Sequence, residues 1–125
     1  MKELLPVSGI ITVLNTPFDA QNRVDDASLR RNVQYALAVD VAGFLVPAMA
    51  SEVYSLEIAE RLRMVEIVTE EVAGRVPIFG GAGEWDATQQ QEMVRHYVQM
   101  GCRQGVLRKK SINSFKTNVN WPTSP

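Results

Sequence analysis

The chain has 125 residues, the length of about one domain, with 46% hydrophobic residues, 22% charged residues and a net charge of −1. No apolar run approaches the roughly 18 residues of a membrane span, and Met1–Pro6 lacks the apolar core of a signal peptide, so we expect a cytoplasmic protein with no membrane partner. The single cysteine, Cys102, and the single histidine, His96, exclude an internal disulfide and make a metal centre improbable, so we expect no metal and no cofactor.

The first predicted unit is a short strand followed by a helix. The β-branched run Gly9–Leu14 predicts a strand, which must end before Pro17 because proline lacks a backbone donor. Asp25 is expected to cap the helix, whose apolar residues recur at helical spacing: Leu29, Val33, Ala36 and Leu37.

The next two units repeat this order of strand and helix. Gly43–Val46 is wholly apolar, as expected for a strand that is covered on both faces, and Ser55 is expected to cap the helix that follows. Val76–Phe79 predicts a third strand. Asp86 is expected to cap a third helix, which ends at Gly101.

The composition changes after a fourth predicted strand, which begins in Gln104–Leu107. Ten of the fifteen residues of Ser111–Pro125 are Ser, Thr, Asn or Pro, which is typical of irregular chain. Residues 1–92 carry a charge of −7 and residues 93–125 a charge of +6. A basic end can bind nucleic acid, but Phe115 alone is too little for a stacking platform, so we expect no nucleic-acid partner.

Alternating strands and helices of this length predict an α/β fold, a parallel sheet with right-handed crossovers. A doubly wound domain could close within this length, whereas a complete (β/α)₈ barrel needs about 250 residues. In both folds, the loops at the carboxyl ends of the strands form the ligand site. The segment after the second strand, Pro47–Glu52, is therefore the candidate site.

Two side chains in this segment could contact a ligand. Glu52 could be a general base or a carboxylate that braces the loop, and we favour bracing because no acid partner is visible nearby. Ser51 could bind a substrate oxygen, but it lacks the Gly-x-Ser-x-Gly surroundings of a nucleophile. We interpret Gly80–Gly83 as a tight loop or pocket wall rather than a phosphate cradle, and Lys109 and Lys110 as solvated basic residues.

Four stretches occur in an order that resembles a known family: Gly9–Phe18 with its Thr-Pro-Phe turn, Ala42–Val46, Ser51–Leu56, and Val72–Ile78 followed by the glycine-rich Gly80–Gly83. The family is that of dihydrodipicolinate synthase and N-acetylneuraminate lyase, class I aldolases and dehydratases that handle pyruvate on a (β/α)₈ barrel. The resemblance covers about residues 6–107. It implies a partial TIM barrel of three βα units and a fourth strand. Residues 1–107 would be the N-terminal part of a lyase domain, and 108–125 an irregular, basic and polar tail.

The resemblance also implies a parent reaction, which is Schiff-base aldol cleavage, condensation or dehydration of a keto acid, in a homo-oligomer. The family loop after the second strand usually reads Gly-Thr-Thr-Gly-Glu, and its threonines hold the carboxylate of the keto acid. Alignment on Glu52 places Met49 and Ala50 at the threonine positions. The residues expected to bind substrate are Ala50, Ser51 and Glu52, with Ser51 as the nearest substitute donor.

No residue of this chain is expected to be catalytic, because the family's tyrosine after strand four and lysine on strand six have no counterpart here. The first interpretation is therefore a truncated or aberrant member of the Schiff-base lyase family. The second is a non-catalytic α/β module that self-associates through exposed strand edges. The third is a complete small α/β domain that binds a phosphate-bearing ligand at Gly80–Gly83.

Overall fold

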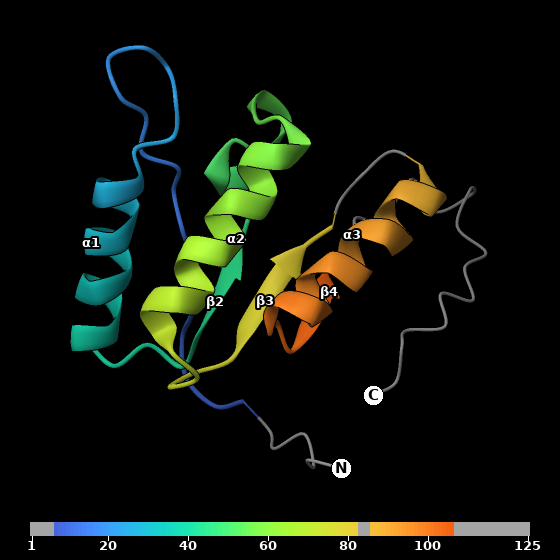
Figure 1. The fold of residues 1–125 in the computed structure, drawn as a ribbon. Coiled ribbons are helices and arrows are strands. Elements are labelled where there is room, and N and C mark those ends of the chain that lie inside the picture. The colour runs from blue at the N-terminus through green and yellow to red at the C-terminus, as the bar shows by residue number, and fades with distance from the viewer. Residues whose placement is uncertain (1–6, 83–85, 107–125) are drawn as a thin grey trace.

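Strand and helix alternate through the computed structural model, which describes residues 7–82 and 86–106 (Figure 1). In chain order the elements are β1 (Ile11–Val13), α1 (Asp26–Ala38), β2 (Gly43–Val46), α2 (Ile58–Val72), β3 (Ile78–Gly81), α3 (Ala87–Met100) and β4 (Gln104–Val106). Two short 3₁₀ turns, η1 (Met49–Ser51) and η2 (Val53–Ser55), join β2 to α2. The three predicted βα units and the fourth strand are confirmed.

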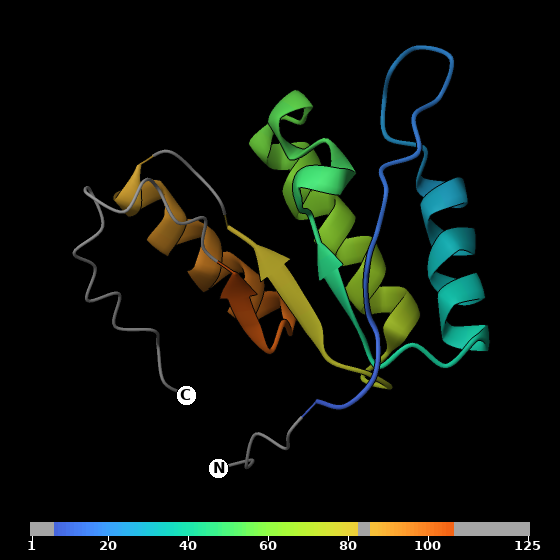
Figure 2. The same cartoon turned by 180° about the vertical axis from the view of Figure 1, so that it is seen from behind.

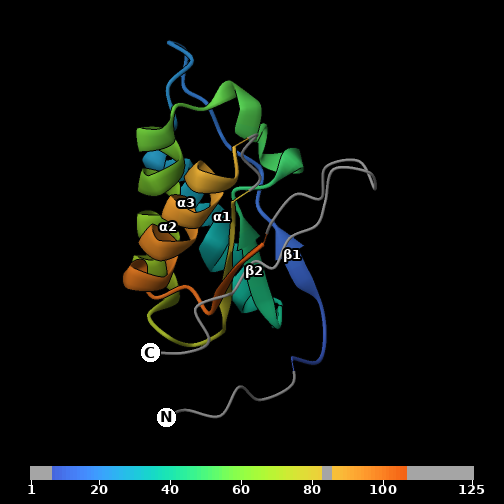
Figure 3. The same ribbon diagram turned by 90° about the vertical axis from the view of Figure 1, so that its right-hand side faces the viewer.

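The four strands form one parallel sheet in the order β1-β2-β3-β4. Because each strand lies next to its predecessor, successive right-handed crossovers put α1, α2 and α3 on the same face of the sheet. Figures 2 and 3 show the strands lying on the other side, away from the three helices. A doubly wound sheet carries helices on both faces, so the described residues have the one-sided arrangement of a partial (β/α)₈ barrel.

The core lies between the helices and the sheet. Phe44 and Val46 of β2 and Ile78 of β3 are buried on the face that the helices cover. Burial of an apolar side chain of this size contributes about 1.5–3 kcal/mol. The helices contribute the buried residues Leu29, Val33 and Leu37 from α1, Met64, Val65, Ile67, Val68 and Val72 from α2, and Met93, Val94 and Tyr97 from α3.

The helix caps match the sequence at three of four predicted positions. The Asp25 carboxylate accepts a 3.1 Å hydrogen bond from the Ser28 N–H, and the Asp86 carboxylate accepts one of 2.9 Å from the Thr88 N–H. Gly101 ends α3 with a left-handed φ of 106°, which an L side chain adopts only with strain.

The predicted cap of the second helix, Ser55, is wrong. Ser55 closes the 3₁₀ turn η2, where its N–H donates to the Glu52 carbonyl oxygen. The helix begins two residues later with Glu57 as N-cap, and the Glu60 carboxylate accepts a 2.9 Å hydrogen bond from the Glu57 N–H. This pair is a capping box built from two glutamates, so a search for Ser or Thr missed it.

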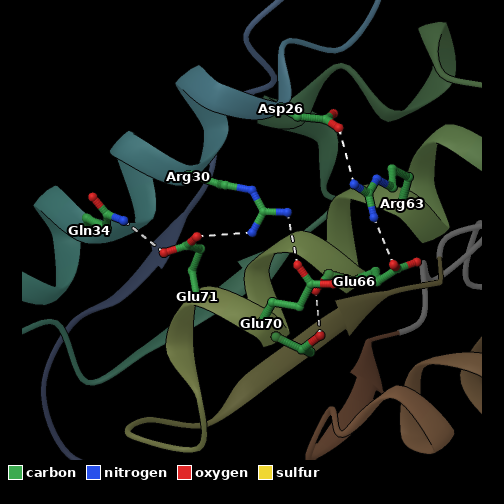
Figure 4. Close-up of polar contacts among 8 residues, drawn as sticks. Asp26, Arg30, Gln34, Arg63, Glu66, Glu70 and Glu71 are labelled. Atoms are coloured by element: carbon green, nitrogen blue, oxygen red, sulfur yellow. Dashed lines mark hydrogen bonds and ion pairs between the residues drawn. The ribbon is translucent and has the colours of Figure 1, made fainter.

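Ion pairs and a hydrogen bond connect α1 to α2 on their outer surface (Figure 4). Arg30 contacts Glu71 at 3.0 Å and Glu70 at 2.9 Å, and the Gln34 amide donates to Glu71 at 2.9 Å. Farther along the helices, Arg63 contacts Asp26 and Glu66. Within the described residues, no helix has the length and apolar run needed to cross a membrane.

Candidate functional site

The loop after β2 is tied to the end of β1 by two hydroxyl groups. The Thr16 hydroxyl donates a hydrogen bond to the Ser51 carbonyl oxygen, and the Ser51 hydroxyl donates one to the Leu14 carbonyl oxygen. The Ser51 hydroxyl also accepts a 3.1 Å hydrogen bond from the Ala48 N–H. Ser51 is fully buried and Thr16 is 6% exposed, so water does not compete for these bonds. The loop is therefore fixed at the carboxyl edge of the sheet.

Ser51 lies at the predicted edge, but its hydroxyl proton already has an acceptor. A serine hydroxyl carries one proton, and here that proton bonds to the Leu14 carbonyl oxygen. A substrate oxygen could take the proton only by displacing that carbonyl. In this geometry the Ser51 hydroxyl positions the loop.

Ala50 and Glu52 flank Ser51, and both are exposed. Glu52 has a left-handed φ of 58°, which turns the chain from η1 into η2, and its carboxylate does not cap η2. The hydroxyls of Thr16 and Ser51 brace the loop, and bracing by the Glu52 carboxylate stays a prediction. The three predicted binding residues thus lie together at one edge, with the Glu52 side chain at the surface.

The predicted glycine loop after the third strand needs a correction, because Gly80 and Gly81 belong to β3 itself. A Cβ atom on Gly81 would lie 1.6 Å from the Pro47 carbonyl oxygen, and one on Gly80 would lie 2.3 Å from the Tyr97 ring. These glycines therefore allow β2 and α3 to approach β3 closely. Gly83 lies outside the described residues, as do Lys109 and Lys110.

Burial changes the pKa of two side chains, Tyr97 of α3 and Cys102 just after that helix. Burial raises the pKa of the Cys102 thiol to about 12, so the thiol is neutral and is a poor nucleophile. Burial also raises the pKa of the Tyr97 phenol, and the nearby charge of Arg61 opposes that shift. Among the described residues, no hydrogen-bond partner faces the Tyr97 hydroxyl. His96, by contrast, is exposed on α3.

Thr16 is the residue at this edge that sequence analysis missed. It was interpreted only as part of the turn that ends the first strand, because its partner lies 35 residues away. The Thr-Pro-Phe motif was the available signal. The described residues bring together no group of three side chains that could hold a metal ion.

The chain matches known proteins over most of the described residues. The model of the Dihydrodipicolinate synthetase family matches residues 6–107. A 4-hydroxy-tetrahydrodipicolinate synthase from Methanothermobacter thermautotrophicus is 31% identical over 98 residues, which are 78% of this chain and 35% of that protein. An N-acetylneuraminate lyase from Salmonella paratyphi B is 31% identical over 87 residues, which are 70% of this chain and 29% of that protein. The chain thus spans about a third of the length of these curated relatives.

Solved structures agree in fold. A putative dihydrodipicolinate synthetase from Pseudomonas aeruginosa matches with a TM-score of 0.81 at 21% identity, covering 90% of this chain and 38% of that one. A prophage protein of the dihydrodipicolinic acid synthase family from E. coli K12, solved in complex with pyruvate, matches with a TM-score of 0.75 at 25% identity, covering 79% of this chain and 33% of that one. These enzymes are TIM barrels, and the fold described above is part of one. The chain belongs to the dihydrodipicolinate synthetase family.

Proposed function

We propose that residues 1–107 supply the N-terminal part of a Schiff-base lyase domain, in which the loop after β2 holds the carboxylate end of a keto acid. The observation that carries the proposal is the hydrogen-bonded pair Thr16 and Ser51, which fixes this loop at the carboxyl edge of the sheet. Active sites of TIM barrels lie at that edge. A structural neighbour solved with pyruvate, a keto acid, supports the substrate class.

The described residues bind and position the substrate in this proposal, and they do not form the imine. Imine formation requires the neutral amine of a lysine. The described ranges contain no lysine, since the four lysines of the chain are Lys2, Lys109, Lys110 and Lys116. Aldol cleavage, condensation or dehydration of a keto acid would therefore take its lysine from outside the described ranges. The irregular tail expected at residues 108–125 lies outside the described residues. The protein is proposed to act in the cytoplasm.

The donors for the carboxylate are proposed to be backbone N–H groups, above all that of Ala50. The hydroxyls of Ser51 and Thr16 are both used within the protein, and neither Met49 nor Ala50 carries a hydroxyl. Backbone N–H groups of a fixed loop can bind an anion without the entropy cost of ordering a side chain. Glu52 lies next to these donors and is exposed. Its negative charge therefore disfavours ligands that carry a large negative charge.

A titration of the full chain with pyruvate, followed by amide NMR shifts, tests this proposal. We expect the Ala50, Ser51 and Glu52 amides to shift with pyruvate and to stay in place with pyruvamide, which has the same shape without the negative charge. The variant Ser51→Ala releases the Leu14 carbonyl and should weaken the response at least about tenfold, a loss of roughly 1.4 kcal/mol. Ser55→Ala, an exposed serine of the same loop, is the matched control and should titrate as the native chain does.

The proposal fails if pyruvate and pyruvamide shift the same amides equally, since the loop then recognises no carboxylate. It also fails if the Ala50, Ser51 and Glu52 amides stay in place while amides elsewhere on the sheet respond to pyruvate.

A further inference from the structure

The apolar surface of the described chain is concentrated at one edge of the sheet. Eight large hydrophobic residues are exposed in the described ranges, and five of them lie on or close to β1 and α1: Val7, Ile10, Val13, Tyr35 and Val39. Ile10 is 73% exposed and Tyr35 is 74% exposed. Large apolar side chains gathered at an edge mark a contact surface more often than single ones scattered over a protein do.

Tyr35 of α1 and Val39, the C-cap residue of this helix, lie on the flank away from α2. Arg30 and Gln34 lie on the flank that contacts α2 through Glu70 and Glu71. At 100° per residue, Tyr35 lies about 140° from Arg30 around the helix, and Val39 follows Tyr35 by one turn. This flank of α1 therefore adjoins the free side of β1, and Figure 1 shows α1 at the end of the helical layer, with α2 on its other side.

The backbone of β1 also has an unused edge. The Leu14 N–H donates to the Leu45 carbonyl oxygen and the Ile10 carbonyl accepts from the Ala42 N–H, so these alternate residues face β2. The residues between them, Ile11 and Val13, direct their N–H and C=O groups to the other side. In the described part of the chain, β1 pairs only with β2, and β4 pairs only with β3.

The sheet face opposite the helices is apolar as well. Val13, Leu45 and Phe79 stand side by side in register across three strands, on the face that the helices leave open. Val13 is 38% exposed, and Leu45 and Phe79 are only partly buried. In a TIM barrel this face is the packed interior of eight parallel strands.

We propose that two copies of this chain close an eight-stranded barrel, with β1 of each copy paired in parallel with β4 of the other. The four parallel strands described in each copy together make eight, and the two-fold arrangement pairs both edges of the described sheet. The face with Val13, Leu45 and Phe79 then becomes the interior. This proposal is independent of the keto-acid site.

Light scattering coupled to size exclusion, on the full chain, measures the assembly. We expect a mass of twice 13.9 kDa that dissociates on dilution. Val13→Pro removes an N–H that faces the free edge, so it should give a monomer with intact helical content by circular dichroism. Val13→Thr keeps that N–H and should stay dimeric.

A second pair of variants leaves β1 unchanged. Tyr35→Arg places a charge on the α1 flank and should weaken dimerisation at least about tenfold, which corresponds to roughly 1.4 kcal/mol. Ile58→Arg changes a similarly apolar, 46% exposed residue at the start of α2, away from the proposed contact, and should stay dimeric. In the native dimer, the Ile11 and Val13 amides should exchange with solvent at least about tenfold more slowly than in the Tyr35→Arg monomer.

Three results would overturn the proposal. A native chain that is monomeric at all concentrations has no such interface. Open-ended assembly beyond the dimer means that the edges pair without closing. A dimer that survives both Val13→Pro and Tyr35→Arg forms through another surface.

Discussion

Thr16 and Ser51 each hold the backbone of the other's segment, although 35 residues separate them. Thr16 donates to the Ser51 carbonyl oxygen, and Ser51 donates to the carbonyl oxygen of Leu14, two residues before Thr16. This reciprocal arrangement fixes the relative positions of the loops after β1 and β2. Any ligand held by these loops depends on a geometry set by two side chains that need not touch it.

Loss of either hydroxyl should destabilise the fold. Ser51→Ala leaves the Leu14 carbonyl and the Ala48 N–H without their partner, and Thr16→Val leaves the Ser51 carbonyl without a donor. An unsatisfied buried polar group costs about 1–3 kcal/mol. Urea unfolding should show a loss of that size for each variant.

The exposed Ser55 provides the control for this experiment. Ser55→Ala should change the free energy of unfolding by no more than about 0.5 kcal/mol. The shared geometry also predicts that the double variant loses less than the sum of the two single losses, because each hydroxyl supports the same contact between loops. Strictly additive losses would show that the two bonds act independently.

Gly81 should tolerate no side chain. A Cβ atom there would lie 1.6 Å from the Pro47 carbonyl oxygen, which belongs to the backbone and cannot move without shifting β2. Gly81→Ala should therefore abolish cooperative thermal unfolding, as followed by circular dichroism.

Gly74 is the matched position for Gly81→Ala, because a Cβ atom there would meet nothing within 4 Å. Its φ of 78° still strains an alanine, so Gly74→Ala should keep cooperative unfolding and lose about 1–2 kcal/mol. Equal effects of the two substitutions would show that backbone conformation, and not the close approach of Pro47, makes glycine necessary in β3.

Local sequence signals predicted the helices and most of their ends, because those features depend on neighbours within a few residues. Asp25 bonds three residues ahead, and Gly101 supplies a left-handed φ at the end of its own helix. Ser55 does not cap a helix because it belongs to a 3₁₀ turn, and residue type alone does not distinguish such a turn from the start of a helix.

The position of Ser51 in the fold could be predicted from the sequence, but the partners of its hydroxyl could not. Ser51 lies at the expected edge of the sheet. Its hydroxyl was expected to bind substrate, but it donates to the carbonyl oxygen of Leu14, which lies 37 positions earlier. Gly81 is glycine because of Pro47, which lies 34 positions earlier and directly follows β2. Contacts between residues more than 30 positions apart follow from the packing of β1, β2 and β3. The spacing of residue types along the sequence does not predict them.

The ion pairs between α1 and α2 should make stability depend on acid. Hydrogen bonds from Gln34 and then Arg30 lower the pKa of the Glu71 carboxyl below its ordinary 4.5. A carboxyl whose pKa is lower in the folded chain stabilises the fold above its unfolded pKa, and this contribution is lost as pH falls through the folded value. The melting temperature of the native chain should therefore decline as the pH falls below about 4.5.

Glu71→Gln removes this titration and should flatten that part of the pH profile relative to the native chain. The comparison is Glu92→Gln, which changes an exposed glutamate of α3 and should leave the profile unchanged. A Glu71→Gln profile as steep as the native one would mean that other carboxyls cause the acid loss. Salt should reduce the difference between the native and Glu71→Gln profiles, because Arg30 and Glu71 are partly exposed.

The chain should not form an imine with pyruvate. Imine formation needs a neutral lysine amine, and enzymes normally obtain one by burying the lysine in an apolar pocket. Of the four lysines, Lys2 lies at the N-terminus, and Lys109, Lys110 and Lys116 lie in or beside a basic, polar stretch of sequence. An ordinary lysine pKa of about 10.4 leaves well under about one per cent of the amine neutral at pH 7.

Incubation with pyruvate and borohydride, followed by mass spectrometry of the intact chain, checks this expectation. Borohydride reduces an imine to a stable amine, so an adduct reports each imine that forms. The loop would also hold pyruvate weakly, because Met49 and Ala50 supply no hydroxyl to its carboxylate. We therefore expect the unmodified mass, with a Schiff-base aldolase as the positive control. A single stoichiometric adduct on Lys109 or Lys110 would mean that this chain builds an aldolase site of its own, with a lysine that no family position supplies.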